Sequence, residues 1–434
     1  MDIHELGAAE AARRIAAGEL TSERLVEACL ARIAAREPAV HAWACLEPAH
    51  ALAQARALDK GPRRGPLHGV PFGLKDIIDT ADLPTEYASS IYRGHRPKAD
   101  AACVAQIREA GGVVLGKAVT TEFANNHPSP TLNPHDATRS PGGSSSGSAA
   151  AVAAGMVPLA LGTQTGGSVI RPAAYCGAAA IKPSFGAINR VGVKLISDSL
   201  DTVGLFARRV DDLSLALSLF TGWPVDGEAS KPPRIGLCRT PRWSLADPAS
   251  RENLESAARL LSSAKAELRE FEMPQGAEAL FDKHKLIMGY ESARSLGWEY
   301  RTHPELISKT LKPRLDEGWK VPRADYDAMR ETARQQRRAL AESMREVDFL
   351  LTLSAPGEAP PLSANTTGDP VFNRAWTLLG LPCINLPFGR GPAGLPLGVQ
   401  LVGRCNEDMA LLAWARWVEK KWGQTPFFSG KNDC

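Results

Sequence analysis

The chain has 434 residues and a net charge of +3, with 44% hydrophobic and 23% charged residues. This is the composition of an ordinary globular protein. It contains no long run of one charge sign, which argues against a nucleic-acid-binding surface as its main purpose. No stretch approaches the ~18 apolar residues of a membrane span, and the first residues lack a signal-peptide pattern. We therefore expect a cytoplasmic protein without a membrane segment.

Cysteine and histidine spacing gives no metal or disulfide signal. None of the eight cysteines forms a CxxC pair, and the nine histidines include no HExxH motif. Metal sites and disulfide frameworks depend on such spacings. We expect buried free thiols, no metal and no cofactor.

The first part of the chain alternates helical and strand patterns. Two amphipathic helices are expected before Glu37–Pro38, followed by a short strand and a helix in "HAWACLEPAHALAQARALDKG". The segment "VPFGLKDIID" reads as a strand. The segment "ADAACVAQIREAGGVVLGKAV" predicts a helix, a Gly-Gly stop and a buried strand.

The second part continues this alternation after a region, 140–205, that is rich in Gly, Ala, Ser and Pro. A strand is expected in "KPPRIGLCRT", and residues 250–346 are strongly helical by periodicity. Strands follow in "VDFLLTLS", "LGLPCINLPFG" and "GLPLGVQLVGR", and "DMALLAWARWVEKKW" closes the pattern as a helix. Alternating strands and helices predict an α/β fold with a mixed, mostly parallel, twisted central sheet flanked by helices.

A Ser/Gly run, "SPGGSSSGSAA" at 140–150, has the composition of a flexible linker. It is followed at once by the small apolar stretch "AAVAAGMVPLALG" and then by a second cluster, "GTQTGGS". Small apolar residues at this density suit a helix packed closely on a sheet. Two such loops would bring serines and uncovered backbone N–H groups together, an arrangement that can hold an anion or a developing oxyanion.

Two common active-site loops do not fit these clusters. A phosphate-binding loop would need GxxxxGK[ST], which is absent. A GxSxG pattern exists only trivially, as Gly143-Ser145-Gly147, with no persuasive His and Asp partners. A serine nucleophile would thus need a base other than histidine. Lys75 stands at the end of an apolar strand, where burial would lower its pKa from ~10.4.

Three long motifs in order then resemble the amidase-signature hydrolases. They are "GVPFGLKDIID", "SPGGSSSGSAAAVAAGMVPLALGTQTGGSVIRPAAYCG" and "AAIKPSFG", with "GLPLGVQLVG" in the C-terminal part. The resemblance implies one amidase-signature domain over 1–434. Its core would comprise about 65–215 plus C-terminal strands in 345–434, with 225–345 as a helical subdomain or cap. Within the family, "GTQTGGSVIRPAAYCG" and "NTTGDPVFNRAWTLLGLPCINLP" are most similar to malonamidase-type enzymes.

The resemblance implies a role for each matching residue. Ser168 would be the nucleophile, Ser144 would bridge it to Lys75, and Lys75 would be the base. The family's bridging serine follows a cis peptide bond. The reaction would hydrolyse an amide through an acyl-enzyme, without metal or cofactor. The oxyanion hole would consist of the backbone N–H groups of Thr165, Gly166, Gly167 and Ser168.

One departure from the family bears on the substrate. Many members read "SDTGGSIRxP", whereas this chain reads "TQTGGSVIRP", with Gln164 in place of an acid and Arg171 one position later. A guanidinium can hold a carboxylate through two hydrogen bonds, so we favour a small carboxylate-bearing amide such as malonamate. In the alternative, Arg171 bonds to loop carbonyls. Neutral, aryl, hydrazide and carbamate substrates also remain open.

Other functional classes compete with a stand-alone amidase. The same core occurs in the A subunit of tRNA-dependent amidotransferases, a glutaminase that acts in a complex. A compact chain and its nucleophile loop favour the stand-alone form. A non-catalytic binding protein would have lost one of the three residues, and none is lost. We expect a small-molecule amide as partner, no nucleic acid or membrane, and a homodimer as one option.

Overall fold

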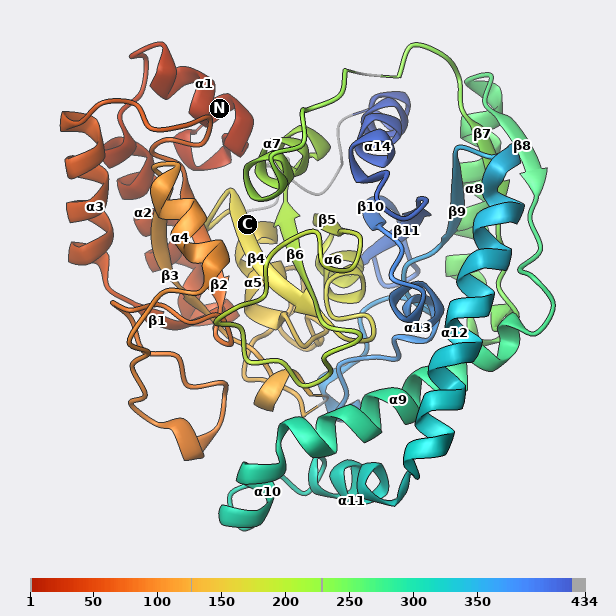
Figure 1. The fold of residues 1–434 in the computed structure, drawn as a ribbon. Coiled ribbons are helices and arrows are strands. Elements are labelled where there is room, and N and C mark those ends of the chain that lie inside the picture. Colours follow the sequence, from red (N-terminus) through yellow and green to blue (C-terminus); the bar gives the residue numbers. More distant parts are fainter. Residues whose placement is uncertain (1, 126, 228, 424–434) are drawn as a thin grey trace.

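The structure, a computed structural model, describes residues 2–125, 127–227 and 229–423. It is built around an 11-stranded sheet with the order β1-β3-β2-β4-β6-β5-β10-β11-β9-β7-β8. In Figure 1 the sheet runs across the molecule, with β1 to β3 on the left and β7 and β8 on the right. The interpretation of Cys434 as a free thiol lies outside the described residues.

The elements alternate along most of the chain. The strands are β1 (Trp43–Leu46), β2 (Pro71–Lys75), β3 (Val113–Ala118), β4 (Leu159–Gln164), β5 (Ala179–Lys182), β6 (Thr202–Ala207), β7 (Arg234–Leu237), β8 (Glu267–Glu270), β9 (Phe349–Leu353), β10 (Cys383–Arg390) and β11 (Pro396–Val402). The α-helices are α1 (Ala8–Ala16), α2 (Ser22–Val40), α3 (Pro48–Lys60), α4 (Ala102–Glu109), α5 (Ser146–Ala153), α6 (Ile170–Cys176), α7 (Val210–Thr221), α8 (Pro248–Ser263), α9 (Leu280–Ser295), α10 (Gly297–Thr302), α11 (Lys312–Lys320), α12 (Arg323–Ser343), α13 (Val371–Leu378) and α14 (Asp408–Trp422).

The sheet is mixed, as the alternation predicts. Strand β2 pairs in parallel with β3 and β4, and β7 pairs in parallel with β8 and β9. The other neighbours are antiparallel. Parallel pairing was expected to dominate and does not. The strands β6, β5, β10 and β11 all run antiparallel to their neighbours, and β10 and β11 are joined by a tight turn that only an antiparallel pair can use.

Buried strands divide their side chains between the two faces of the sheet. In β4, Leu159 and Leu161 join one hydrophobic cluster, while Ala160 joins the other. This is the two-residue alternation of an extended strand. On the face of Ala160, helix α5 contacts β2, β3 and β4 through a run of small residues, Ala149–Val152. The small side chains allow the helix backbone to lie close to the sheet.

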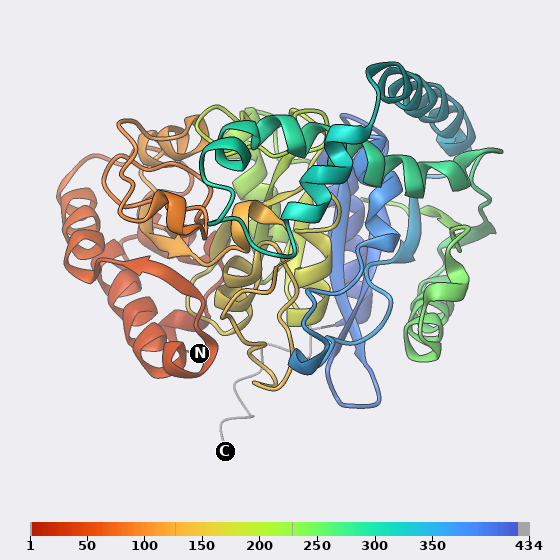
Figure 2. The same ribbon diagram turned by 90° about the horizontal axis from the view of Figure 1, so that it is seen from below.

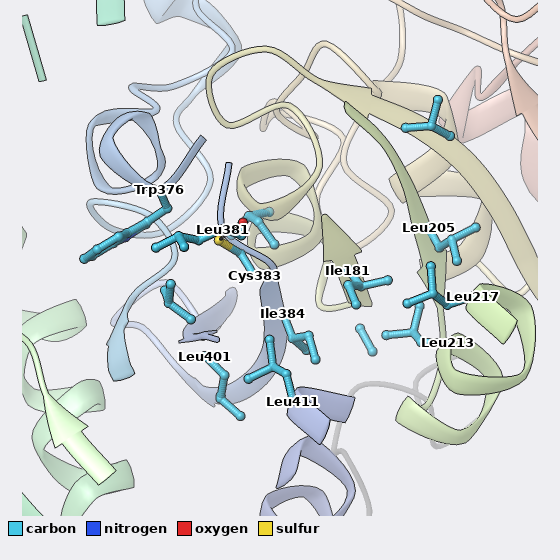
Figure 3. Close-up of a cluster of buried hydrophobic side chains, with 14 of the residues drawn as sticks. Ile181, Leu205, Leu213, Leu217, Trp376, Leu381, Cys383, Ile384, Leu401 and Leu411 are labelled. Carbon is cyan, nitrogen blue, oxygen red and sulfur yellow. Dashed lines mark hydrogen bonds between the residues drawn. The ribbon is translucent and has the colours of Figure 1, made fainter. Parts of the chain in front are cut away.

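The opposite face is covered by larger apolar side chains. Figure 3 shows Ile181 and Leu205 from β5 and β6 beside Leu213 and Leu217 of α7. In the same view Ile384 of β10 and Leu401 of β11 approach Leu411 of α14. The central strands are therefore enclosed by helices on both faces, as expected of an α/β fold.

Most expected elements lie where the sequence patterns indicated. Two details differ. Strand β8 (Glu267–Glu270) interrupts the stretch 250–346 that was expected to be helical. Helix α2 continues through Pro38 to Val40 and is capped by His41, which has a positive φ of 52°. A proline in the last turns removes one N–H donor without preventing the helix from finishing. None of the helices in the described part of the chain combines the length and apolar character that a membrane span requires.

The helices α9 to α12 form a separate layer at one edge of the sheet. In Figure 1, α9, α10 and α11 occupy the lower part of the molecule and α12 runs from there up the right-hand side; Figure 2 shows this layer from below. Helix α9 contacts α11, α12 and α13. The contact between α9 and α11 is close because two glycines, Gly289 and Gly318, face each other there.

We expect Gly318→Ala to destabilise this helical layer, because the added Cβ would lie 2.0 Å from the carbonyl oxygen of Gly289. Overpacking costs about 1–3 kcal/mol, more than the up to about 1 kcal/mol gained by removing a helical glycine. Calorimetry should give a lower Tm than for the wild type. The matched control is Gly289→Ala, whose Cβ would meet Gly318 Cα at an ordinary 3.7 Å. Equal Tm values for the two variants would contradict the close packing of α9 on α11.

Candidate active site

The site begins where two parallel strands end at the same edge of the sheet. Lys75 is the last residue of β2, and Thr163 lies near the end of its neighbour β4. The Lys75 amine donates hydrogen bonds to Ser144 Oγ at 2.7 Å and to Thr163 Oγ1 at 2.8 Å. The Lys75 side chain is completely buried. Parallel pairing thus brings Lys75 beside a hydroxyl that the sequence motifs did not single out.

Burial controls the protonation of Lys75. Desolvation lowers the pKa of the Lys75 amine to about 7, and the buried charge of Asp201 opposes this fall. Lys75 forms no salt bridge with any residue that the structure describes. Its neighbour Asp76 pairs with Lys117 instead, at 3.4 Å. A large part of the Lys75 population is therefore neutral at physiological pH and can accept a proton.

The Ser/Gly run is buried and rigidly bonded, unlike a linker. Helix α5 starts within it, at Ser146, and the Gly143–Ser144 peptide bond is cis. Ser145 Oγ donates to the Thr163 carbonyl and accepts from the Thr163 N–H, both at 3.2 Å. At Gly147 a Cβ would lie 2.2 Å from the Ala42 carbonyl oxygen, so only glycine fits. The Ser and Gly residues that resemble a linker are therefore present here because they allow close packing.

The second Gly/Ser cluster forms the turn between β4 and α6. Its residues Thr165 to Ser168 line a cavity. In the described structure, the N–H groups of Gly166, Gly167 and Ser168 donate to no protein acceptor. At Gly167 a Cβ would lie 2.3 Å from Asn373 Oδ1, so this position also requires glycine. The turn therefore has three N–H groups without a protein acceptor in residues that line the cavity.

Ser168 follows these donors and is 8% exposed. Within the described residues, no hydrogen bond joins the hydroxyls of Ser144 and Ser168. The structure thus brings Lys75 and Ser144 into contact, and it places Ser168 at the wall of the cavity, on the turn that follows β4.

Gln164 stands where many family members carry an acid, and it holds the start of α6. Its side-chain oxygen accepts from the N–H groups of Val169 and Ile170, at 2.9 and 3.0 Å. Its amide nitrogen donates to Thr377 Oγ1 at 2.9 Å. A carboxylate could accept the first two bonds but could not donate the third. Gln164 thus connects the turn Thr165–Ser168 and the start of α6 to α13.

A buried carboxyl group fixes Thr165 from the other side. Asp201 accepts a short hydrogen bond from Thr165 Oγ1 and further bonds from the N–H groups of Ile196 and Ser197, at 2.7 and 3.0 Å. Burial raises the pKa of Asp201 to about 6, and these bonds oppose the rise. Sequence reasoning missed Asp201, because the loop that carries it has no motif of its own.

Arg171 is buried at the cavity wall and bonds to the protein's own loops. Its guanidinium donates to the carbonyl of Gly143, at 2.5 Å, and to that of Gly368, at 2.7 Å. A longer bond of 3.2 Å reaches Thr367 Oγ1, while Nε has no hydrogen-bond partner in the described structure. Desolvation lowers the pKa of Arg171 to about 10. This is the geometry of the loop-bonding alternative, although Arg171 does line the cavity.

The cavity has a volume of about 720 Å³ and lies between the turn Thr165–Ser168 and the helices α9, α11, α12 and α13. Its walls carry apolar side chains from α9 to α12, among them Leu286, Met288 and Met329. Two more guanidinium groups, those of Arg314 and Arg374, also line it, and Arg374 pairs with Asp369 at 2.9 Å. A cavity of this size holds a drug-sized ligand.

Sequence reasoning missed four residues of this site, two of them inside the quoted matching stretches and two outside. They are Thr163, Asp201, Thr377 and His284, whose ring nitrogen Nε2 lies 2.8 Å from the Thr165 carbonyl oxygen. Each is a common residue type at a position without a distinctive pattern. Only Thr163, which lies in β4 a few residues before Ser168, was close enough in the sequence to be considered as part of the site.

Metal-binding residue types do not gather at this site. Among the described residues, no group of three or more His, Cys, Asp or Glu side chains could hold a metal ion. The seven described cysteines are free, five of them buried. These thiols are spread through the hydrophobic clusters and take no part in the cavity wall.

Several known proteins are similar to almost the whole chain. The profile of the Amidase family matches residues 24–412. The chain is 35% identical to the A subunit of the glutamyl-tRNA(Gln) amidotransferase of Chloroflexus aggregans, over 95% of each protein. Two solved structures share 30% identity: a crystal structure of an amidase, with a TM-score of 0.90, and the peptide amidase of Stenotrophomonas maltophilia, with 0.84. The alignments cover 96% of this chain and 100% and 97% of those chains.

These relatives extend the likeness beyond the motifs to almost the whole chain. They comprise amidases together with one component of an amidotransferase, so the finer resemblance to malonamidase-type enzymes stays a prediction. The match of the family profile and the shared fold agree on the broader class. The chain belongs to the amidase family and is an enzyme that acts on amide C–N bonds.

Proposed function

We propose that the chain hydrolyses an amide through an acyl-enzyme on Ser168, activated by Lys75 through Ser144. The observation that carries this proposal is the 2.7 Å contact between Lys75 Nζ and Ser144 Oγ, made by a fully buried lysine. A base must be within about 2.6–3.2 Å of the proton it takes, and its pKa should lie near the working pH. The Lys75 amine, with a pKa of about 7, meets both conditions.

The proposed proton path leads from Ser168 through Ser144 to Lys75, and its last step uses the observed Lys75–Ser144 hydrogen bond. Neutral Lys75 accepts the Ser144 proton across their hydrogen bond, and Ser144 accepts the Ser168 proton. Ser168 Oγ then attacks the amide carbonyl carbon. When the C–N bond breaks, the proton returns along the same path to the leaving nitrogen. Water then attacks the acyl carbon and loses a proton to the same relay. The relay returns that proton to Ser168 Oγ as the acyl–oxygen bond breaks and the acid leaves.

Charge on the tetrahedral intermediate would be stabilised by the turn that carries the nucleophile. The N–H groups of Gly166, Gly167 and Ser168 have no protein acceptor in the described structure, and these residues line the cavity. Together with Thr165 they are the proposed oxyanion hole. Each well-placed donor of this kind contributes about 10²–10³ in rate.

The substrate class is proposed from the cavity wall. Its apolar lining and the guanidinium groups of Arg314 and Arg374 suit an amide with an apolar body and a carboxylate. Malonamate is a small example of a carboxylate-bearing amide. A volume of about 720 Å³ leaves room for larger ones, so aryl amides, hydrazides and carbamates stay in the candidate set.

A second candidate function is that of a glutaminase that acts within an amidotransferase complex. The observation that favours it is the 35% identity to the A subunit of a glutamyl-tRNA(Gln) amidotransferase over 95% of both proteins. Glutamine is also a carboxylate-bearing amide, and the arginine-lined cavity suits it. The two candidates therefore differ in partners and substrate more than in chemistry.

We expect the purified chain to release ammonia from malonamate faster than from a neutral amide of similar size, and Ser168→Ala to abolish both activities. The variant loses the nucleophile, so kcat should fall at least about 10⁴-fold. Ammonia release is the measurement, with glutamine as third substrate. Ser145→Ala is the matched control, since the Ser145 hydroxyl bonds only to the backbone of Thr163 in the described structure.

The pattern of substrates separates the candidates. Turnover of glutamine alone, and only in the presence of partner proteins, would favour the amidotransferase. Gel filtration of the isolated chain would show at the same time whether it forms a homodimer. Wild-type activity in the Ser168→Ala protein would overturn the nucleophile assignment for every substrate.

We expect kcat/KM to rise with pH through about 7 and to level off above it, because Lys75 acts in its neutral form and has a pKa of about 7. Below that value the rate should fall about tenfold per pH unit. Asp201→Asn should move the midpoint to lower pH, since the Asp201 charge raises the pKa of Lys75. A midpoint near 10, as for an exposed lysine, would contradict the role of Lys75.

We expect Arg171→Lys to lower Tm and to reduce kcat on malonamate and on the neutral amide by the same factor. A lysine keeps the charge but cannot bond Gly143 and Gly368 together, and each bond to a charged donor contributes about 1.5–3 kcal/mol. Steady-state kinetics on both substrates is the measurement. A selective rise of KM for malonamate would instead identify Arg171 as the carboxylate clamp.

A further inference from the structure

One side chain of helix α9, that of His284, contacts the turn that carries the proposed oxyanion donors. His284 is 1% exposed, and its Nε2 lies 2.8 Å from the carbonyl oxygen of Thr165. His284 comes from the helical layer, 119 residues away from Thr165 in the sequence. It lines the same cavity as Ser168.

The chemistry of the contact fixes the tautomer of His284. A carbonyl oxygen can only accept, so Nε2 must carry the hydrogen and donate it. Burial lowers the pKa of His284 to about 4, so the ring is neutral at the pH at which Lys75 is active. Nδ1 then carries no hydrogen, and it has no hydrogen-bond partner in the described structure. The buried ring therefore makes one directed hydrogen bond, to Thr165.

This bond bears directly on a proposed oxyanion donor. In a planar trans peptide the carbonyl and the following N–H point in opposite directions. Holding the Thr165 carbonyl toward α9 therefore aims the Gly166 N–H away from it. The next peptide is held in the same way, since Thr377 Oγ1 donates to the Gly166 carbonyl at 2.9 Å and shares this bond with the Asn373 carbonyl at 3.1 Å.

Two consecutive glycines make such external support necessary. Glycine has the widest choice of backbone conformations, so the Gly166 and Gly167 peptides have no intrinsic preferred orientation. Helix α9 gives a second support two turns beyond His284, where Glu291 accepts from Ser197 Oγ at 2.5 Å and from the Ser199 N–H at 3.0 Å. That loop carries Asp201, which holds the Thr165 hydroxyl.

We infer that His284 is a positioning residue that orients the Gly166 N–H toward the oxyanion. The inference rests on the proposed function, in which this N–H stabilises the tetrahedral intermediate. His284 itself makes no hydrogen bond to Ser168 or Lys75 in the described structure. Its effect is felt in the transition state, through the peptide that it holds, and the ground-state substrate gains little from it.

The test compares three variants of His284 in the full chain. His284→Gln keeps an N–H donor at a similar reach, His284→Asn has the same amide on a shorter side chain, and His284→Leu has no donor. We expect kcat to fall about 10–100-fold in the Asn and Leu variants, with KM changed less than about threefold, and the Gln variant to recover most of the rate. The affinity for a trifluoromethyl ketone, which forms a tetrahedral oxyanion with the serine, should fall by the same factor as kcat/KM.

Each outcome decides a separate point. Equal kcat for the Gln and Asn variants, both folded by circular dichroism, would overturn the positioning role of His284, even if His284→Leu failed to fold. A rise in KM with unchanged kcat would also overturn it, because it would assign His284 to substrate binding. Ser168→Ala, measured alongside, tests the proposed function. If it is inactive while the Asn and Leu variants keep full kcat, only the inference about His284 fails.

Discussion

An uncharged amine buried at the end of a strand is the constraint on which the site depends. An ammonium group deprived of water costs several kcal/mol unless a counter-ion meets it. Lys75 forms no salt bridge within the described residues and has two hydroxyls as its partners, those of Ser144 and Thr163. Because no counter-ion in the described structure offsets this cost, desolvation lowers the pKa of the Lys75 amine to about 7. A large part of the population is then the neutral amine, which is the form that can accept a proton.

Lys117 shows what happens to a lysine that is buried as deeply but differently surrounded. It lies on β3, next to β2, and has no exposed surface. Its amine meets Asp76 at 3.4 Å, the Ile78 carbonyl at 2.7 Å and Thr85 Oγ1. Asp76 directly follows Lys75, but successive side chains of an extended chain point to opposite sides, so Asp76 serves Lys117. One acid is thereby kept away from the amine that must stay neutral.

Much of the fold could be predicted because buried strands with clear punctuation have a strong local signal. The segments that became β2, β3, β9 and β10 were recognised in this way. The direction of pairing was not, since the order of strands depends on contacts between distant segments. The Gly- and Ala-rich stretch 140–205 concealed β5 and β6 for a different reason: small residues pack against anything and give little periodicity.

The site, in turn, could be predicted only where the motifs carry it. The spacing of Lys75, Ser144 and Ser168 came from the resemblance, and the Lys75–Ser144 contact agrees with it. Thr163, Asp201 and His284 act through their position in the fold, which a single sequence of ordinary residue types does not reveal.

Arg171 and Gln164 lie close to Ser168 in the sequence, but their side chains already form hydrogen bonds within the protein. The sequence places Arg171 a few residues after Ser168, and it does line the cavity. Spacing alone cannot tell that its donors already bond to Gly143 and Gly368. Gln164 is likewise committed, to Val169, Ile170 and Thr377. Gln164 thus holds the start of α6, and Arg171 connects α6 to the loops at Gly143 and Gly368. Both side chains are already used within the protein. A substrate carboxylate would therefore need groups other than these two, such as those on the helices that complete the cavity wall.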